Sequence, residues 1–397
     1  MKTSIARSVL PAAVLLAGVA LGGGADAQQG SEPLSYELTR LDSLGGASSV
    51  GASINDHGWI AGRSNLPTGV RHAALWRDGA LIKDLGTLGG PEKGSTVLWP
   101  VKNLRGIISG ISYTDEPDPN SEKWSCGFFL ASPGTRCFGF RWEDGVMTPL
   151  MPFAGGTHSF ATGTNNAGRT VGWAENSVVD TTCVLPQRLQ FRAVVWGPQG
   201  NIIGELPPLP GFDDTVTAAT AINDRGQVVG ISGICDQAAG RLSAIHNVLW
   251  EHGQPINIGD FGGVAWNTPM MINQGGDIVG FANASEADGS NLNPRAFLKI
   301  PGEAIRNLGM LDGDVNSSAA SINNWRQVVG DSCDPEDNCR AFIWQNGVMR
   351  DLNSLVDDRE DVLTIAKDID DFGRITGQGF DDEAGRFFAF VATPIWK

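Results

Sequence analysis

The sequence has 397 residues, of which 41% are hydrophobic and 18% charged, and its formal net charge is −15. Nucleic-acid backbones are bound by clustered Lys and Arg, so this acidic balance argues against a nucleic-acid partner. It is instead typical of a solvated acidic surface that keeps a protein soluble.

The first segment reads as an export signal. Lys2 and Arg7 precede an apolar run from Val9 to Leu21, and small residues end in Ala25-Asp26-Ala27. We therefore predict a cleaved secretory signal peptide at 1–27, followed by a short flexible segment at 28–35. No later stretch approaches the roughly 20 apolar residues of a membrane helix, so we expect a secreted or periplasmic protein with no integral membrane segment.

The rest of the chain is organised by a repeat. A polar turn of the type Asn-Asp-x-Gly, followed by a Val-Val-Gly-like strand, recurs about every fifty residues, beginning at Asn55, Asn103, Asn165, Asn223, Asn273, Asn323 and Asp370. Short strands repeated at this period are typical of a β-propeller. We predict an all-β fold, with residues 36–397 forming a single seven-bladed β-propeller.

Each unit contains four strand-like segments, and the chain ends complement each other. The first unit is preceded by a lone fourth segment at 38–46, and the last unit stops after its third segment at 388–392. We expect the N-terminal strand to complete the last blade and close the ring, which removes the free sheet edge. An open solenoid is the alternative, although it would usually carry distinct caps.

Chain order also predicts two unlike faces. With the N-terminal strand outermost, the small-residue segments, such as 49–54, lie nearest the axis. The connections after the second and fourth strands then share one face. The longest of them lie at 113–137, 175–189, 234–245, 283–293 and 332–339. We expect any localised function on this insertion-bearing face, because variable loops on a rigid scaffold commonly carry function.

Six cysteines lie in these insertions, as expected for disulfides in an exported chain. Their positions in the repeat predict three pairs: Cys126 with Cys137, Cys183 with Cys235, and Cys333 with Cys339. A zinc site is the competing interpretation, but the spacings match no finger or ribbon pattern.

The repeat resembles the bacterial extracellular proteins named for a His-Ala-Phe tripeptide, the HAF family. The resemblance covers nearly all of the chain after residue 27 and rests on Ile222–Gly230, His72–Trp76 and Asp84–Gly90. No unit has the intact tripeptide, since Arg295-Ala296-Phe297 and Arg340-Ala341-Phe342 replace its His. The resemblance implies export and a repeat architecture, and the family has no assigned activity.

Catalytic signatures are missing from the sequence: it has no His-Glu-x-x-His, no Gly-x-Ser-x-Gly and no phosphate-binding glycine loop. His158 differs from the other histidines because it precedes an inner strand near the mouth of the predicted channel. Equivalent connections supply Glu92, Lys93, Asp213, Asp214, Asp314, Glu360 and Asp361. A polysaccharide hydrolase or lyase that uses His158 with Asp213, Asp214 and Asp314 is therefore an alternative function.

Three tryptophans outside the regular column are expected to offer flat faces to a ligand such as a sugar: Trp99, Trp124 and Trp266. Trp99 stands where other units have a small residue. Glu92 and Asn316 are the polar residues expected beside them.

Cofactors are not expected, with one exception. The stretch 312–316, Asp-Gly-Asp-Val-Asn, begins like a calcium loop and makes Asp312 and Asp314 the candidate metal ligands. Ser317 stands where that loop needs Gly, and no Glu closes it.

The sequence thus favours a monomeric, non-catalytic binding module that recognises a glycan, a peptide or an envelope protein through its long-loop face. The enzyme above is one alternative, and a structural envelope protein is another.

Overall fold

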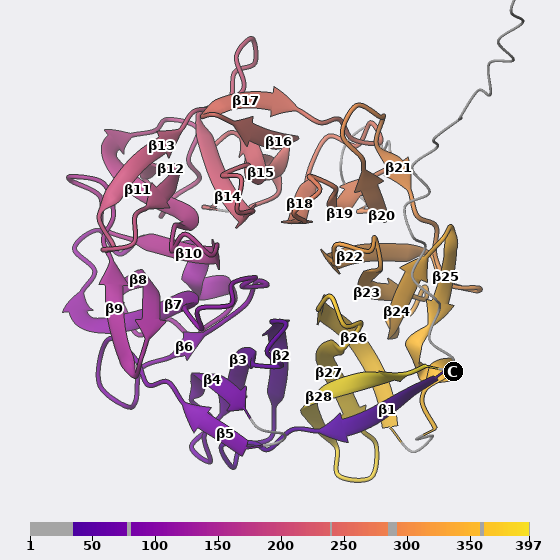
Figure 1. Ribbon diagram of the computed structural model, residues 1–397. Coiled ribbons are helices and arrows are strands. Elements are labelled where there is room, and N and C mark those ends of the chain that lie inside the picture. Colours follow the sequence, from indigo (N-terminus) through magenta and orange to yellow (C-terminus); the bar gives the residue numbers. More distant parts are fainter. Residues whose placement is uncertain (1–34, 78–80, 239, 285–291, 358–360, 397) are drawn as a thin grey trace, which may run out of the picture. The chain divides into compact units, whose positions relative to one another are not determined.

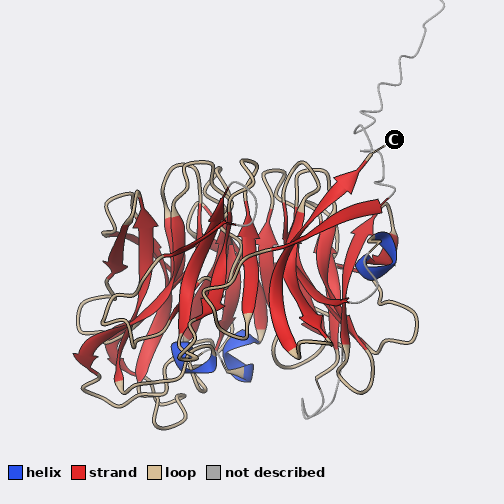
Figure 2. Ribbon diagram, turned by 90° about the horizontal axis from the view of Figure 1, so that it is seen from below, coloured by secondary structure: helices blue, strands red, loops and turns tan. Residues whose placement is uncertain are grey.

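The computed structural model describes residues 35–77, 81–238, 240–284, 292–357 and 361–396, all within the compact unit 32–397. The predicted signal peptide, residues 28–34 of the predicted flexible segment and Glu360 lie outside the described residues. Seven antiparallel four-stranded sheets are arranged in a ring (Figure 1), and their strands run along the ring axis (Figure 2). The predicted seven-bladed β-propeller is therefore confirmed.

We number the blades from 1 to 7 by their innermost strands. These are β2 (Ser49–Ile54), β6 (Ser95–Thr96), β10 (Ser159–Thr164), β14 (Val216–Ile222), β18 (Thr268–Ile272), β22 (Asn316–Ile322) and β26 (Asp361–Ile369). The second strands are β3 (Ile60–Asn65), β7 (Ile108–Pro117), β11 (Thr170–Val179), β15 (Val228–Gly233), β19 (Ile278–Asn283), β23 (Val328–Cys333) and β27 (Ile375–Asp381).

The third strands are β4 (Arg71–Arg77), β8 (Thr135–Glu143), β12 (Leu189–Trp196), β16 (His246–Glu251), β20 (Pro294–Lys299), β24 (Cys339–Gln345) and β28 (Arg386–Ile395). The outer strands are β5 (Leu81–Asp84), β9 (Val146–Leu150), β13 (Ile202–Leu206), β17 (Gln254–Asn257), β21 (Arg306–Asn307), β25 (Val348–Asp351) and, in blade 7, β1 (Ser35–Arg40). Three short 3-10 helices lie in connections: η1 (Ser125–Phe128), η2 (Arg241–Ala244) and η3 (Leu352–Leu355).

Blade 7 closes the ring as the sequence predicts. Strand β1 pairs with β28 from Ser35 opposite Ile395 to Arg40 opposite Phe390. The contacts that join blade 7 to blade 1 include Ala389 N donating to Ser49 Oγ at 2.9 Å and Trp76 Nε1 donating to the Asp42 carbonyl at 2.8 Å. The closing strand thus supplies the fourth, outermost strand of blade 7.

The apolar core lies between adjacent blades. Its largest fully buried side chains include the repeated third-strand aromatics Trp76, Trp196, Trp250, Phe297 and Phe342. The aromatic side chains of the third strands therefore fill the space between sheets. Burying each one contributes roughly 1.5–3 kcal/mol to the free energy of unfolding.

The repeated turn asparagines hold neighbouring blades together. Each of six donates from Nδ2 to a backbone carbonyl of the next blade at 2.9–3.3 Å; these are Asn55, Asn103, Asn165, Asn223, Asn273 and Asn323. The side-chain oxygen of the same residue accepts N–H groups of its own turn, as Asn223 does from Arg225 and Gln227. This double role explains why the repeat keeps an amide at the turn.

Steric crowding explains why each Val-Val-Gly-like strand contains a glycine. A Cβ at any of the seven equivalent positions would lie 1.9–2.3 Å from a carbonyl oxygen of the innermost strand; these are Gly62, Gly110, Gly172, Gly230, Gly280, Gly330 and Gly377. In the six blades other than blade 2, the innermost strand contains a register shift beside that glycine. Bulge and glycine therefore form one unit of the repeat.

The three predicted disulfides are all present: Cys126–Cys137, Cys183–Cys235 and Cys333–Cys339. Disulfides persist in oxidising compartments, so these bonds are consistent with an extracellular or periplasmic protein. None of the helices among the described residues is long and apolar enough to cross a lipid bilayer.

Candidate functional site

The insertions of blades 2, 3 and 4 pack against one another. Glu122 in blade 2 accepts from Arg188 N at 3.0 Å and Leu189 N at 2.8 Å, both in blade 3. Ser125 Oγ, also in blade 2, donates to the Ala238 carbonyl in blade 4 at 2.8 Å and accepts from Trp173 Nε1 at 2.9 Å. These long loops therefore form a fixed cover over three blades.

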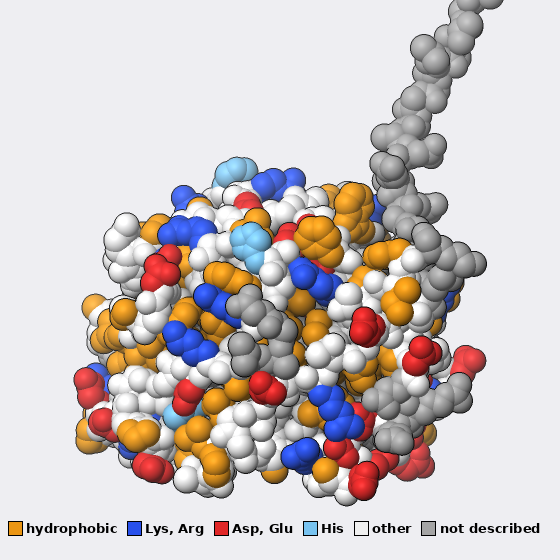
Figure 3. All heavy atoms as spheres, turned by 60° about the horizontal axis from the view of Figure 1, so that its bottom comes forward, with side chains coloured by type: hydrophobic (Ala, Val, Ile, Leu, Met, Phe, Trp, Pro, Cys, Tyr) orange, Lys and Arg blue, Asp and Glu red, His pale blue; other side chains and the backbone are white. Residues whose placement is uncertain are grey.

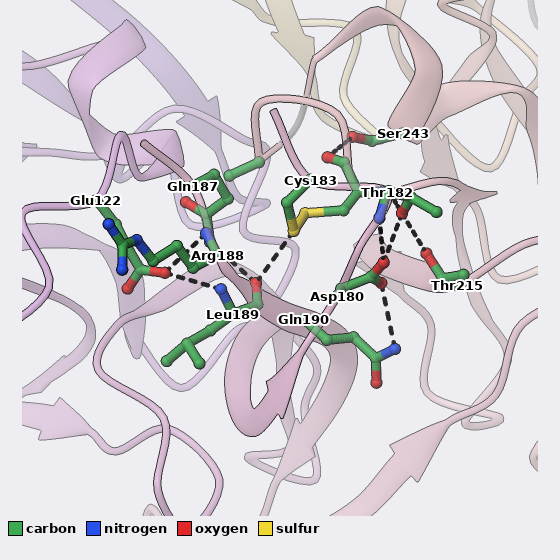
Figure 4. Close-up of a disulfide and its surroundings, with 12 residues drawn as sticks. Glu122, Asp180, Thr182, Cys183, Gln187, Arg188, Leu189, Gln190, Thr215 and Ser243 are labelled. Atoms are coloured by element: carbon green, nitrogen blue, oxygen red, sulfur yellow. Dashed lines mark hydrogen bonds between the residues drawn. A yellow bond between two sulfur atoms is a disulfide. The ribbon is translucent and has the colours of Figure 1, made fainter. Parts of the chain in front are cut away.

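The Cys183–Cys235 bond links the insertions of blades 3 and 4 covalently (Figure 4). Beside it, Asp180 Oδ1 accepts from both the N and the Oγ1 of Thr182, at 2.8 and 2.6 Å. Thr182 Oγ1 in turn accepts from Cys235 N at 3.0 Å and lies 3.0 Å from Thr215 Oγ1. The disulfide and this network fix the position of one insertion relative to the next.

Side chains from blades 1, 2, 3, 4, 5 and 7 enclose a cavity of about 540 Å³. Aromatic side chains supply much of the wall: Trp99, Phe128, Phe129, Trp173, Trp266 and Phe281. Phe128 and Trp266 are 48% and 38% exposed, so they mark the mouth of the cavity. This volume falls in the range of small-ligand pockets.

Two columns of the repeat line this cavity. The first is the residue after the crowded glycine: Arg63, Ile111, Trp173, Ile231, Phe281, Asp331 and Gln378 in blades 1 to 7. Five of these seven line the cavity, the exceptions being Ile111 and Asp331. The second column is the bulged residue of the innermost strand, which contributes Ala52, Thr220, Met270 and Lys367.

The first column divides the axis into two walls. Blades 2 to 5 present apolar side chains, whereas blades 6, 7 and 1 present Asp331, Gln378 and Arg63 in succession. Lys367 of blade 7 adds a second basic side chain near Arg63. One cavity therefore combines an aromatic wall with a polar, cationic wall.

Burial changes the pKa of Arg63 and Lys367 on that wall and of Asp331, which lies near Lys367. Burial raises the pKa of Asp331 to about 6, although the charge of Lys367 opposes the rise. Burial lowers the pKa of Lys367, and the neighbouring charge of Arg63 lowers it further. Burial and the charge of Arg71 together lower the pKa of Arg63 to about 9. Arg63 remains a cation at neutral pH, but one held in poorly hydrated surroundings.

Trp99 and Trp266, two of the tryptophans predicted to bind a ligand, both line the cavity. Trp99 contacts Phe129, Phe160 and Trp173 edge to face, with ring centroids 5.7–6.1 Å apart. It does not replace a small residue in register, because Thr96 to Asn103 is two residues longer than the equivalent Val50 to Asn55. The longer segment places the indole in the cavity wall.

Trp124 is a correction to the expected set of aromatic platforms. It is only 3% exposed, and its ring stacks on His158 with centroids 5.6 Å apart and planes 13° from parallel. The indole belongs to a buried cluster that includes other residues of the insertions, and it has no open face for a ligand.

His158 is also buried, at 2% exposure. Its Nδ1 accepts from Cys137 N at 3.1 Å, and its Nε2 lies 3.3 Å from Asp118 Oδ2. Glu175 beneath it accepts from the N–H groups of Thr157 and His158. These contacts give His158 a structural role at the junction of blades 2 and 3.

The carboxylates predicted to act with His158 in catalysis do not contact it. Two of them contact other side chains. Asp214 Oδ2 lies 2.9 Å from His246 Nδ1, and Asp314 Oδ1 accepts from Arg340 Nη2 at 2.7 Å. Asp213 is exposed one residue before Asp214. Each of these contacts is local to its own pair of elements.

The remaining predicted residues lie outside the cavity wall. Glu92 is exposed, while Lys93 Nζ lies 3.8 Å from Asp115 Oδ1. Asn316 is partly buried in β22 opposite Cys333. Asp361 is buried in β26 and forms an ion pair with Arg40.

Metal ligation was expected, if anywhere, at Asp312 and Asp314. Arg340 Nη2 reaches both the Asp312 carbonyl and Asp314 Oδ1, so a guanidinium already supplies positive charge there. Two other clusters within the described chain have possible ligand atoms close together: Asp331 with Cys333 and Cys339, and Asp118 with Glu122 and His158. The two cysteines form a disulfide, which removes them as thiolate ligands.

Sequence reasoning missed the polar wall of the cavity. Arg63, Lys367 and Asp331 belong to no motif and lie in three different blades. Reading the residue after each repeat glycine would have exposed the change from apolar to polar side chains around the axis. That signal appears only when the seven units are compared position by position.

No protein-family model matches the sequence, and comparison with curated proteins gives no match. Among solved structures, the chain is similar to the WD40 β-propeller domain of Doa1 (12% identity, 90% of this chain and 97% of that chain covered, TM-score 0.42). It is also similar to AofleA from Arthrobotrys oligospora (11% identity, 80% and 86% covered, TM-score 0.37). A third match is XC5397 from Xanthomonas campestris, described as a gluconolactonase (15% identity, 51% and 69% covered, TM-score 0.28). At these identities and TM-scores, the matches carry no conclusion about function.

Proposed function

We propose that this chain is an exported, non-catalytic binding protein whose ligand enters the central cavity from the insertion-bearing face. The observation that carries this proposal is the cavity of about 540 Å³ with three tryptophans in its wall. Aromatic rings offer large apolar faces at a small cost in conformational entropy, which suits them to ligand recognition.

The surroundings of the cavity support a permanent site. Trp266 at the mouth is held by blade 4, because Trp266 N donates to the Arg241 carbonyl at 3.0 Å. Phe129 is held by blade 1, because Arg71 donates from Nη1 to its carbonyl. Both contacts join neighbouring blades, and a site fixed before binding loses less free energy to ordering.

A cavity suits a compact ligand, such as one sugar ring, one peptide side chain or a small molecule, better than an extended polymer surface. The enzyme alternative is not favoured, because His158, Asp214 and Asp314 are engaged in separate contacts. The exported location is supported by the three disulfides and by the leader predicted at 1–27.

The test fills the cavity and measures the binding of a neutral aromatic compound. Met270 lies at the bulge position and lines the cavity, whereas Met151 is 49% exposed and is not among the lining residues. We expect calorimetry to detect binding of 2-naphthamide to the native chain, and Met270→Trp to weaken it at least tenfold. Met151→Trp, the matched control, should bind like the native chain. Undiminished binding to Met270→Trp would place the ligand elsewhere and refute the proposed site.

A further inference from the structure

The described residues that line the cavity include two basic side chains and no acidic one. Arg63 and Lys367 line it directly, while Asp331 is the carboxylate close enough to influence Lys367. Arg71 adds a further positive charge near Arg63. This surplus stands out on a chain whose formal net charge is −15.

Arg63 has unused hydrogen-bonding capacity. Its Nε is buried without a hydrogen-bond partner among the described residues. A buried donor left unpaired costs free energy, and a guanidinium matches a carboxylate with two parallel hydrogen bonds. The structure therefore leaves a place for an anion beside Arg63.

The opposite wall determines what the anion is attached to. Trp173 stacks on Phe160 with ring centroids 4.0 Å apart, and Trp99 packs edge to face against both rings. Ile231 and Phe281 extend the same apolar wall through blades 4 and 5. A ligand that reaches both walls needs a flat apolar body and one negatively charged end.

We propose that the cavity selects small aromatic carboxylates, with the carboxylate between Arg63 and Lys367 and the ring against the apolar wall of blades 2 to 5. This inference rests on the proposed function, since it names the ligand class of the same site. The nearby charge of Asp331 favours the charged form of Lys367.

The test compares 2-naphthoate with 2-naphthamide, which have nearly the same shape but differ in charge. The native chain should bind 2-naphthoate at least tenfold more tightly by calorimetry at low ionic strength. Added NaCl should weaken the binding of 2-naphthoate but not that of 2-naphthamide, because salt screens charge. Equal affinities for the two compounds would overturn the anion inference while leaving the cavity as a binding site. Binding of neither compound would overturn the proposed function as well.

Variants locate the anion. Arg63→Gln should bring the preference for 2-naphthoate over 2-naphthamide below threefold, and Lys367→Gln should act in the same direction. Arg386→Gln removes the same charge from an exposed position on β28 and is the control. A preference that survives both Arg63→Gln and Lys367→Gln would refute the assignment.

Discussion

Arg374 Nε donates a hydrogen bond to Asp370 Oδ2 at 2.6 Å, and this pair occupies the place that an asparagine takes in the other six inter-blade turns. Asp370 accepts the N–H groups of its turn as those asparagines do, but a carboxylate has no N–H to donate to the next blade. Arg374 supplies the missing donor, since its Nη2 lies 3.0 Å from the Asp56 carbonyl and 3.5 Å from that of Asn55. The guanidinium thereby joins blade 7 to blade 1.

We expect Arg374→Ala to lower the free energy of unfolding by roughly 3–5 kcal/mol, because it leaves the buried Asp370 carboxylate without its cation. The double variant Asp370→Asn/Arg374→Gln should recover most of this loss, since Asn323 and Gln327 form the same arrangement in blade 6. Urea unfolding followed by circular dichroism measures both. A double variant as unstable as Arg374→Ala would show that Arg374 acts through other contacts.

The crowded glycine predicts a steep steric penalty. A Cβ on Gly230 would lie 2.0 Å from the Ala218 carbonyl oxygen, whereas the nearest atom to a Cβ on Gly204 is 4.0 Å away. Gly230→Ala should therefore cost more than about 3 kcal/mol or prevent folding, and Gly204→Ala should stay within about 0.5 kcal/mol of the native chain. Thermal unfolding compares the two, and similar costs would contradict the steric explanation.

Glu175 should make stability depend on pH. Burial raises its pKa to about 7, with the charge of His158 opposing the rise. Below about pH 4.5 the carboxyl is protonated in both the folded and the unfolded chain. As the pH rises toward 7, the unfolded chain ionises first, so this contribution to the free energy of unfolding falls by roughly 3 kcal/mol.

Glu175→Gln should remove this slope. The side-chain oxygen of Gln at position 175 can still accept from Thr157 N and His158 N. The side-chain oxygen of Gln187, Oε1, has no hydrogen-bond partner among the described residues. The variant should gain stability relative to the native chain as the pH rises from 5 to 8. An unchanged difference across that range, measured by urea unfolding, would mean that Glu175 does not titrate there.

The disulfides should differ in their contribution to stability. Cys183 and Cys235 are 52 residues apart in sequence, whereas Cys333 and Cys339 are 6 apart. In the chain-entropy model, removing the first bond by double Ser substitution costs about 4 kcal/mol and removing the second costs about 2 kcal/mol. Calorimetric unfolding of the two double variants gives the order, and a larger loss at Cys333–Cys339 would contradict it.

Most of the fold could be predicted because the spacing and order of the repeated segments determine how the blades are arranged. The spacing of the turn asparagines gave the number of blades, and the incomplete first and last units predicted the pairing of β1 with β28. The cysteine pairs followed from their positions in neighbouring insertions. Each of these conclusions needs only the order of segments along the chain.

The site was less predictable because it depends on burial and on contacts between blades. Trp124 and Trp266 both lie in connections, yet the packing of the insertions covers one and leaves the other 38% exposed. Similarly, His158 precedes an inner strand as expected, but the blade 2 insertion places Asp118 and Trp124 against it. Sequence position alone does not reveal which loop covers which residue.

The pairing of each bulge with its glycine has a consequence for how such a protein can change. The glycine and the turn asparagine carry the steric and hydrogen-bonding demands of the ring, while the residue after the glycine faces the axis. Under the proposed function, substitutions at the members of this column that line the cavity, such as Arg63 and Gln378, change what the centre recognises while leaving the glycine and the asparagine in place. Affinity and foldability are therefore encoded at adjacent but separate positions, which makes the axis a suitable place to introduce new ligand preferences by selection or by design.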